Sequence, residues 1–297
     1  MLSYGAQKQA SRTMTPEAYC QQKTRQSGSS FYYSFFFLPA PRRRAITALY
    51  AFCREVDDVV DECDDPLQAQ RQLEQWREEI SKLYRGEPEH PVGQALLPVI
   101  HAFDLAQEHF LEIIDGMEMD LHHQGYENFS RLSLYCYRAA SVVGLMAAEI
   151  FGYQNRQTLK YAHDLGMAFQ LTNILRDVRE DAQMGRCYLP ADEMAHFNVS
   201  FEQLQQGQWH EGMTGLFALQ AERAEGYYQQ AFARLPEEDR YHQLSGVIMA
   251  RIYHRVLEAI QEQGYPVLQR RVSLPRRHKI RLALHCAWQE WWRARHQ

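Results

Sequence analysis

Two short acidic motifs have the residue types and spacing of a metal–diphosphate site. Asp57 and Asp61 lie four residues apart near the start of the chain. Asn173, Asp177 and Asp181 repeat that spacing twice near its middle. Residues four apart share one face of a helix. Carboxylate and amide oxygens are ligands that Mg²⁺ prefers, and Mg²⁺ commonly shares its coordination sphere with substrate phosphates. The chemistry predicted is the capture and ionisation of a diphosphate.

The alternative is that these acids line solvated helix faces, as acidic pairs usually do. Val56, Val59 and Val60 surround the first pair, and the second motif follows the apolar run 165–171. Carboxylates that project from apolar helices are costly unless they are paired or metal-bound. Two such motifs in one chain therefore favour a metal site.

Arginines accompany both motifs. Arg54 precedes Asp57 by three residues, Arg176 and Arg179 interleave the second motif, and Arg186 follows it. Arginines beside a polyphosphate would neutralise its charge, although each could equally form a surface ion pair. The segment 185–190 reads either as a flap over the acids or as a plain turn.

Two apolar segments could line a substrate cavity. The aromatic run 31–38 suits either a core or the stabilisation of a carbocation by ring faces. Small residues follow Tyr135 at helical spacing, namely Ala139, Val143 and Gly144. They leave room either for a prenyl tail or for close helix packing. Tyr135 would then lie at the diphosphate end of such a channel, where its hydroxyl could donate a hydrogen bond or relay a proton; a packing role is the alternative.

Bulk properties limit the other classes of function. The chain has 297 residues, is 45% hydrophobic and carries a net charge of −5, which permits a sizeable core and argues against nucleic-acid binding. Six scattered cysteines without a CxxC pair indicate reduced thiols. GxGxxG, Walker A, HExxH and GxSxG motifs are absent, and no signal peptide or membrane-length apolar run is visible.

The periodicity is helical along nearly the whole chain. We expect an all-α, single-domain bundle over residues 15–297 after a flexible segment 1–14. A first helix should start at 38–41 and run to about 62. Further helices are expected at 66–85, 92–103, 106–122, 130–151, 154–183, 191–195, 200–206, 212–234, 237–263 and 274–295. The last is basic and aromatic, with Ile280, Leu284, Ala287 and Trp291 at helical spacing. It could rest on an anionic membrane or pack on the core.

The motifs together resemble the squalene/phytoene synthase family. The resemblance is carried by residues 29–31, 50–61, 135–137, 170–181 and 185–190, and it extends from about Tyr19 to Lys279. It implies an all-α isoprenoid synthase fold with a central prenyl diphosphate cavity. It also implies head-to-head (1′-1) condensation of two prenyl diphosphates with Mg²⁺, for which Mn²⁺ could substitute. Residues 27–39 and 45–62 look most like the bacterial hopanoid-pathway presqualene diphosphate synthases.

The resemblance also assigns roles to single residues. The metal ligands would be Asp57, Asp61, Asn173, Asp177 and Asp181. Tyr135 matches a tyrosine of the cyclopropane-forming step, and Arg54 and Arg176 would assist departure of the diphosphate. Substrate-binding positions would be Ser30, Tyr50, Arg54, Gln170, Arg186, Tyr188, Tyr253, Arg271 and Lys279, with Ala139, Val143 and Gly144 in the channel wall.

The expected reaction joins two farnesyl diphosphates into presqualene diphosphate in squalene and hopanoid biosynthesis, without NADPH. Phytoene synthase, using geranylgeranyl diphosphate, and NADPH-dependent squalene synthase are the alternatives. A non-catalytic assembly factor is disfavoured because both acidic motifs are complete. We expect a bacterial cytoplasmic protein in transient contact with the inner membrane surface and with downstream squalene-pathway enzymes, and no nucleic-acid partner.

Overall fold

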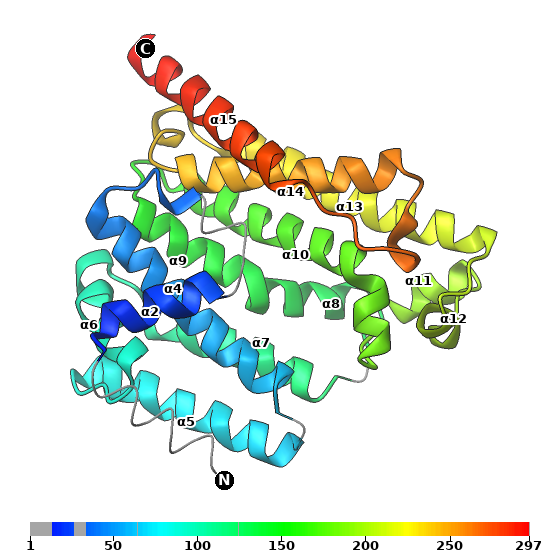
Figure 1. The fold of residues 1–297 in the computed structure, drawn as a ribbon, viewed down its shortest axis with the longest axis horizontal. Helices are drawn as coiled ribbons and strands as arrows, with labels where there is room; N and C mark the ends of the chain where they lie inside the picture. The colour runs from blue at the N-terminus through cyan, green and yellow to red at the C-terminus, as the bar shows by residue number, and fades with distance from the viewer. Residues whose placement is uncertain (1–13, 27–33, 64, 124, 297) are drawn as a thin grey trace. The chain divides into compact units, whose positions relative to one another are not determined.

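The computed structural model describes residues 14–26, 34–63, 65–123 and 125–296. Every regular element in these ranges is helical (Figure 1), which confirms the all-α prediction. The chain groups into two compact units. Unit 1 extends to Leu121 and takes in Glu149–Phe151; unit 2 holds His122–Ala148 and the chain from Gly152 onward. A single domain over residues 15–297 stays a prediction, and residues 1–13 of the predicted flexible segment lie outside the described part.

Unit 1 is built around one helix that carries the first acidic motif. Its helices are α2 (Pro16–Gln26), α4 (Ala40–Asp61), α5 (Pro66–Arg85), α6 (Pro91–Phe103) and α7 (Gln107–Leu121). α4 contacts each of the other four. Its fully buried Phe52 meets Trp76 of α5 and Phe110 of α7 edge-on, at centroid distances of 5.6 and 5.1 Å. Burial of large aromatic side chains is a strong apolar driving force, and it fixes the register of α4.

Local chemistry explains which helices of unit 1 the sequence predicts well. α5 has the predicted bounds because Pro66 occupies its first turn, Asp65 accepts a hydrogen bond from the Leu67 N–H at 3.0 Å, and Gly86 ends it with φ of 87°. α2 is absent from the prediction. Only Cys20 and Thr24 are buried along it, so its sequence has little apolar periodicity.

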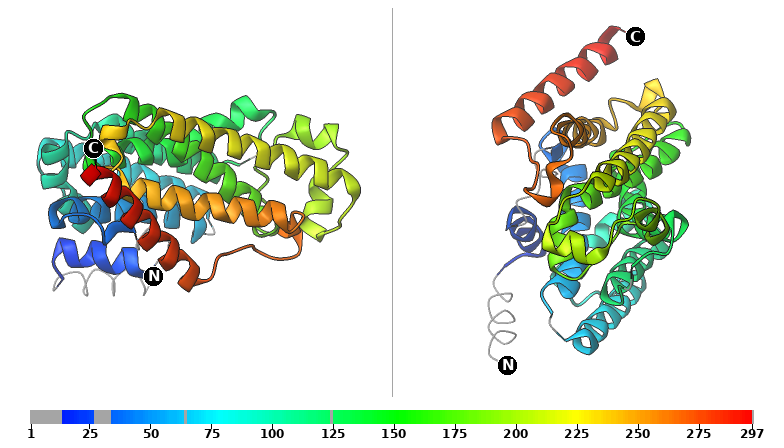
Figure 2. Two further views of the ribbon diagram at one scale, coloured as in Figure 1. Left: turned by 90° about the horizontal axis from the view of Figure 1, so that it is seen from above. Right: turned by 90° about the vertical axis from the view of Figure 1, so that its right-hand side faces the viewer.

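Unit 2 is built around α10, which carries the second acidic motif. Its elements are α8 (Phe129–Cys136), the π-helical η2 (Tyr137–Ser141), α9 (Val142–Phe151, in unit 2 up to Ala148), α10 (Gln157–Gln183), α11 (Ala191–His196), α12 (Phe201–Gln206), α13 (Glu211–Arg234), the 3₁₀ turn η3 (Glu237–Asp239), α14 (Leu244–Glu262), the 3₁₀ turn η4 (Pro266–Leu268) and α15 (Arg276–His296). α13 runs alongside α10, as Figures 1 and 2 show, and α10 also contacts η2, α14 and α12.

Two predicted helices of unit 2 are interrupted. The predicted helix 130–151 contains the π-helical turn η2, and the predicted helix 237–263 is split between η3 and α14. A π-helical turn admits an extra residue without a marked change in sequence pattern, so apolar periodicity does not reveal it.

Small residues bring η2 and α9 close to α10. A side-chain carbon on Gly166 would lie 2.5 Å from the Ser141 Cα, and one on Gly144 would lie 2.7 Å from the Ala162 carbonyl oxygen. The Ser141 hydroxyl donates to the His163 carbonyl at 2.8 Å. Close helix packing, one of the two interpretations of the small residues, thus accounts for Gly144.

One stretch, Phe129–Phe151, is long and apolar enough to cross a membrane by length and composition alone. α8 and η2 pack against α10, and core helices of folded proteins often pass the same test. We therefore assign this stretch to packing within the fold.

A buried carboxylate fixes the start of α10. Asp239, which is fully buried, accepts hydrogen bonds from the Gln154 N–H at 2.6 Å, the Asn155 N–H at 3.0 Å and the Thr158 hydroxyl at 2.6 Å. It pairs two backbone donors of the turn that precedes α10 and ties that turn to Thr158 in the first turn of the helix.

We expect Asp239→Asn to lower the free energy of unfolding by about 2–3 kcal/mol, because an amide replaces a charged acceptor of buried donors. Urea unfolding measures this. Glu238→Gln is the matched control, since Glu238 makes an exposed bond to the Asn155 amide, and it should change stability by less than about 0.5 kcal/mol. Equal effects of the two substitutions would contradict the anchoring role.

Candidate active site

The first acidic motif lies at the carboxyl-terminal end of α4, where Arg54 forms ion pairs with the acids of the same helix. Arg54 donates to both Asp57 and Asp58. Burial alone lowers the pKa of Arg54, but the charges of Asp57, Asp58, Tyr50 and Asp61 outweigh it and raise the pKa above its ordinary value. The predicted residues of unit 1 therefore share one electrostatic environment. Ser30, the remaining predicted position in this part of the chain, lies outside the described residues.

Unit 1 also contains an ion network that the sequence analysis missed. Lys23 of α2 pairs with Asp58 at 2.8 Å and with Glu55 at 3.1 Å, and the Tyr19 hydroxyl donates to Glu55 at 2.7 Å. Asp58 thus pairs with Lys23 as well as with Arg54. The network was missed because helix α2 was not predicted, and Lys23 reaches Asp58 only if that segment is a helix packed on α4.

The second motif occupies the one partly open stripe of a buried helix. Between residues 169 and 181 the buried positions of α10 are 171, 172, 174, 175 and 178, and Arg179 is exposed. The half-buried positions are 169, 170, 173, 176, 177, 180 and 181, a helical repeat along one face. All the site residues predicted on α10, namely Gln170, Asn173, Arg176, Asp177 and Asp181, lie on this stripe.

Two arginines form bidentate ion pairs with Asp177. Arg176 Nε and Nη2 donate to its two carboxylate oxygens at 2.8 and 2.5 Å, and Arg271 Nε and Nη2 donate to the same oxygens at 2.8 and 3.1 Å. Burial alone raises the pKa of Asp177, but these bonds and charges outweigh it and hold the pKa below its usual range. Asp177 is therefore a carboxylate at neutral pH.

A third cation lies beside this pair. Burial lowers the pKa of Lys279, and the charges of Arg176 and Arg271 lower it further, so Lys279 stands in the field of both arginines. Tyr253 hydrogen-bonds to Arg176 and its ring lies 4.9 Å from that of Phe169. Arg176 of α10 and Arg271 of the segment after η4 thus bind one carboxylate, and Lys279 of α15 lies near both arginines.

One side-chain oxygen on α10 that could bind a metal accepts no hydrogen bond in the described part of the chain. Asn173 Oδ1 is shielded from solvent, and no donor in the described part of the chain bonds to it. An unsatisfied buried oxygen costs about 1–3 kcal/mol, so the site suits a ligand that this oxygen can bind. Within residues 14–26, 34–63, 65–123 and 125–296, no three His, Cys, Asp or Glu side chains are clustered closely enough to hold a metal. The Asn173 amide oxygen is a possible metal ligand in addition to the carboxylates.

Two further predicted residues, Tyr135 and Tyr188, lie next to this stripe. The Gln170 amide donates to the Tyr135 hydroxyl at 3.4 Å, and the Tyr135 ring stacks on Tyr188 at 5.2 Å. Tyr126 and His123 complete the aromatic cluster, at 5.7 Å from Tyr135 and 4.9 Å from Tyr188 respectively. Neither was predicted, because their contacts to residues 135 and 188 depend on the tertiary fold.

The loop 185–190 is anchored beside Asp181. The Arg186 N–H donates to the Asp181 carbonyl at 2.8 Å, and His123 Nε2 lies 2.9 Å from the Cys187 nitrogen. The Cys187 carbonyl oxygen also lies 2.9 Å from this Nε2, so the tautomer of His123 decides whether it donates or accepts. Burial lowers the pKa of His123 and the Arg186 charge lowers it further, against the hydrogen bond to the Cys187 backbone, which raises it. Tyr188 and Leu189 are buried. The loop therefore packs against the end of α10.

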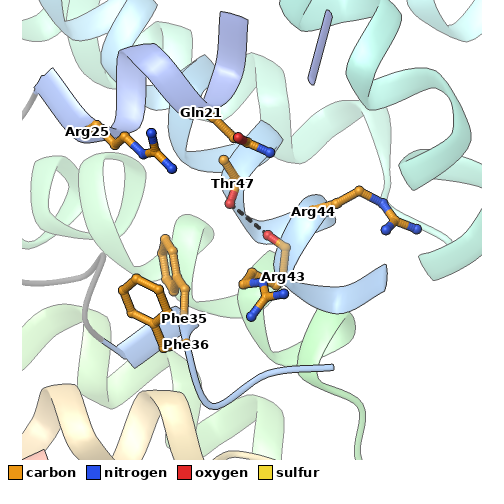
Figure 3. Close-up of a pocket in the computed structure, with 7 residues that line it drawn as sticks. All are labelled: Gln21, Arg25, Phe35, Phe36, Arg43, Arg44 and Thr47. Atoms are coloured by element: carbon orange, nitrogen blue, oxygen red, sulfur yellow. Dashed lines mark hydrogen bonds between the residues drawn. The ribbon is translucent and has the colours of Figure 1, made fainter. Parts of the chain in front are cut away.

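Of the predicted apolar lining residues, Ala139 and Val143 are half-buried, as is Gly144. A pocket of about 290 Å³ lies at the other end of α4 from the acids, between α2 and the segment before α4 (Figure 3). It is lined by Phe35 and Phe36 of the aromatic run together with Gln21, Arg25, Arg43, Arg44 and Thr47. Phe35 and Leu38 are buried while Phe36 and Phe37 are exposed, so only part of that run belongs to a core.

Comparisons with known proteins agree along most of the chain. The family model described as squalene/phytoene synthase matches residues 24–278. A phytoene synthase from Arthrospira platensis is 34% identical over 272 residues, 86% of this chain and 87% of that protein. A presqualene diphosphate synthase from Rhodopseudomonas palustris is also 34% identical, over 88% of this chain and 93% of that protein. The crystal structure of a dehydrosqualene synthase in complex with a ligand has a TM-score of 0.81 at 30% identity, covering 92% of this chain and 96% of that one.

Proposed function

Because the chain belongs to the squalene/phytoene synthase family, we propose that it joins two molecules of farnesyl diphosphate head to head into presqualene diphosphate. The predicted isoprenoid synthase fold is confirmed by the solved relatives. The observation that carries the proposal is the stripe on α10, where carboxylate and amide oxygens lie next to Arg176, Arg271 and Lys279. Oxygen donors beside clustered cations suit a divalent metal bound to a diphosphate.

The donor set fits Mg²⁺, with Mn²⁺ as a substitute. In unit 2, Asn173, Asp177 and Asp181 would bind metal, and the buried, unsatisfied Asn173 Oδ1 is the observation that supports this site. In unit 1, Asp57 and Asp61 would bind metal. When bound, the metal would supply charge neutralisation for the departing diphosphate. All the donors are oxygens, and hard oxygen ligands favour Mg²⁺ over thiophilic metals.

The cations of the chain would bind and stabilise the diphosphate. Arg176 and Arg271 each present two donors to one carboxylate, a geometry that also matches phosphate oxygens. Arg54 instead gives one donor to each of two acids of α4, Asp57 and Asp58. An arriving diphosphate would take over donors that now bind acids, and this exchange places positive charge where negative charge develops as the C–O bond breaks.

The carbon–carbon bonds of the product form next. The farnesyl cation is attacked by the C2=C3 double bond of the second farnesyl diphosphate, and loss of a proton closes the cyclopropane. One diphosphate leaves and the second is retained in the product. Water must be excluded from the cation, a role that suits Ala139, Val143, Gly144 and the rings of Tyr135 and Tyr188. No NADPH is consumed in this half-reaction.

A second candidate is phytoene synthase, which would use geranylgeranyl diphosphate. It is favoured by the identity to phytoene synthases, which equals that to presqualene diphosphate synthases. NADPH-dependent squalene synthesis is the third possibility. We place the enzyme in the bacterial cytoplasm, serving hopanoid synthesis and passing its product to downstream squalene-pathway enzymes.

The deciding experiment offers the purified protein farnesyl and geranylgeranyl diphosphate separately, with Mg²⁺, with and without NADPH. Products are dephosphorylated and identified by mass spectrometry. We expect presqualene alcohol from farnesyl diphosphate, with no dependence on NADPH. Phytoene from the longer substrate would establish the second candidate, and farnesol alone, even with excess enzyme, would refute condensation.

We expect Tyr135→Phe to reduce turnover by about 10²-fold or more, the range for lost proton-transfer assistance, with little change in KM. The ring and its stacking on Tyr188 are retained, so the melting temperature should stay close to that of the wild type. Tyr137→Phe is the control, because Tyr137 faces His163 at 6.0 Å, and its turnover should be unaffected. Unchanged turnover of Tyr135→Phe would assign this tyrosine to packing.

A further inference from the structure

One face of α15 packs on unit 2 through small and paired residues. Ala283, Cys286 and Glu290 are buried at spacings of three and four, and α15 contacts α14 (Figure 1). Glu290 accepts from Arg240 at 3.0 and 2.9 Å and from Arg293 at 3.0 Å. The only acid of this helix is therefore used inside the fold.

The opposite face of α15 is an exposed apolar stripe. The exposed fractions are 39% for Ile280, 59% for Leu284, 60% for Trp288, 41% for Trp291 and 49% for Trp292. Their spacings of four, four, three and one put them on one side of the helix. Three of the five tryptophans of the chain lie here. Of the four residues that the sequence pattern named, Ile280, Leu284 and Trp291 lie on this stripe, and Ala287 is half-buried.

Positively charged residues lie at both ends of this stripe. Arg276–His296 contains five arginines and one lysine against the single acid Glu290, in a chain with a net charge of −5. Arg277 and Arg281 are exposed on the turns before Leu284. At the other end, the Arg295 guanidinium lies 4.1 Å from the ring centre of Trp291. We call the five apolar residues together with Arg277, Arg281 and Arg295 the α15 outer face.

This chemistry matches an anionic bilayer surface. Tryptophan is enriched where lipid headgroups meet acyl chains. Amphipathic helices with tryptophan and leucine on one side and flanking basic residues lie in that layer, held by apolar burial and by attraction to anionic lipid. A stable protein dimer uses about 20–30 residues a side, many more than one helix face offers.

We propose that the α15 outer face docks the protein on anionic lipid, with the apolar stripe in the headgroup layer and the arginines on the lipid phosphates. The proposal rests on α15 alone and not on the reaction that the protein catalyses. Docking would bring unit 2 to the layer in which prenyl substrates and their products accumulate.

The test is co-sedimentation of the purified full chain with phosphatidylcholine vesicles, with and without phosphatidylglycerol. We expect binding only to the anionic vesicles, weakening as salt rises. Trp288→Gln/Trp291→Gln/Trp292→Gln should lower the partition coefficient at least about 10-fold. Trp209→Gln is the matched control, since Trp209 is equally exposed but lies outside α15, and it should bind as the wild type does.

A second variant keeps the test sharp if the tryptophan variant does not fold. Arg277→Gln/Arg281→Gln retains the apolar stripe and should bind anionic vesicles at least about 10-fold more weakly. Equal binding of wild type to both vesicles, or unchanged binding of the variants, would overturn the proposal. So would a shift from dimer to monomer in the tryptophan variant by sedimentation velocity, which would make the face a contact between copies. Condensation of detergent-solubilised substrate, measured without vesicles, reports separately on the reaction.

Discussion

The bidentate contact of Arg176 and Arg271 with Asp177 is the interaction on which the site of unit 2 depends. It joins the acid stripe of α10 to the segment after η4, and Lys279 at the start of α15 stands in the same field. One carboxylate beside two arginines, with Lys279 near them, leaves an excess of positive charge in this region. Addition of a metal alone places two more positive charges in an already cationic region, which electrostatics opposes. Addition of a metal together with a diphosphate gives each arginine a new anionic partner.

The packing of α8, η2 and α9 on α10 positions the aromatic residues of that site. Gly166 and Gly144 allow the backbones to approach so closely that a β-carbon at either position would overlap Ser141 or Ala162. The π-helical turn η2 lies between Tyr135 and this close contact, and such turns are frequent at functional sites. Together they bring the Tyr135 hydroxyl to the Gln170 amide on the open stripe of α10.

The sequence predicts features that depend on local spacing and fails where tertiary contacts decide. Four-residue spacing suffices to put Asn173, Asp177 and Asp181 on one face, and Asp65, Pro66 and Gly86 suffice to bound α5. Arg271 is 94 residues from Asp177, and only the resemblance to a family pointed to it. Lys23, His123 and Tyr126 were missed because each acts through a partner on another element. The π-helical turn was missed because it leaves the apolar pattern unchanged.

The most direct test of this charge balance is the melting temperature of the protein with Mg²⁺ alone, with inorganic diphosphate alone and with both. We expect both together to raise the melting temperature by more than the sum of the separate rises, because ligand binding to the folded state stabilises it. Arg271→Gln should lose most of this excess. Arg255→Gln, which removes an exposed pair with Glu262 on α14, should retain it. A full rise with Mg²⁺ alone, or an undiminished excess in Arg271→Gln, would contradict the account.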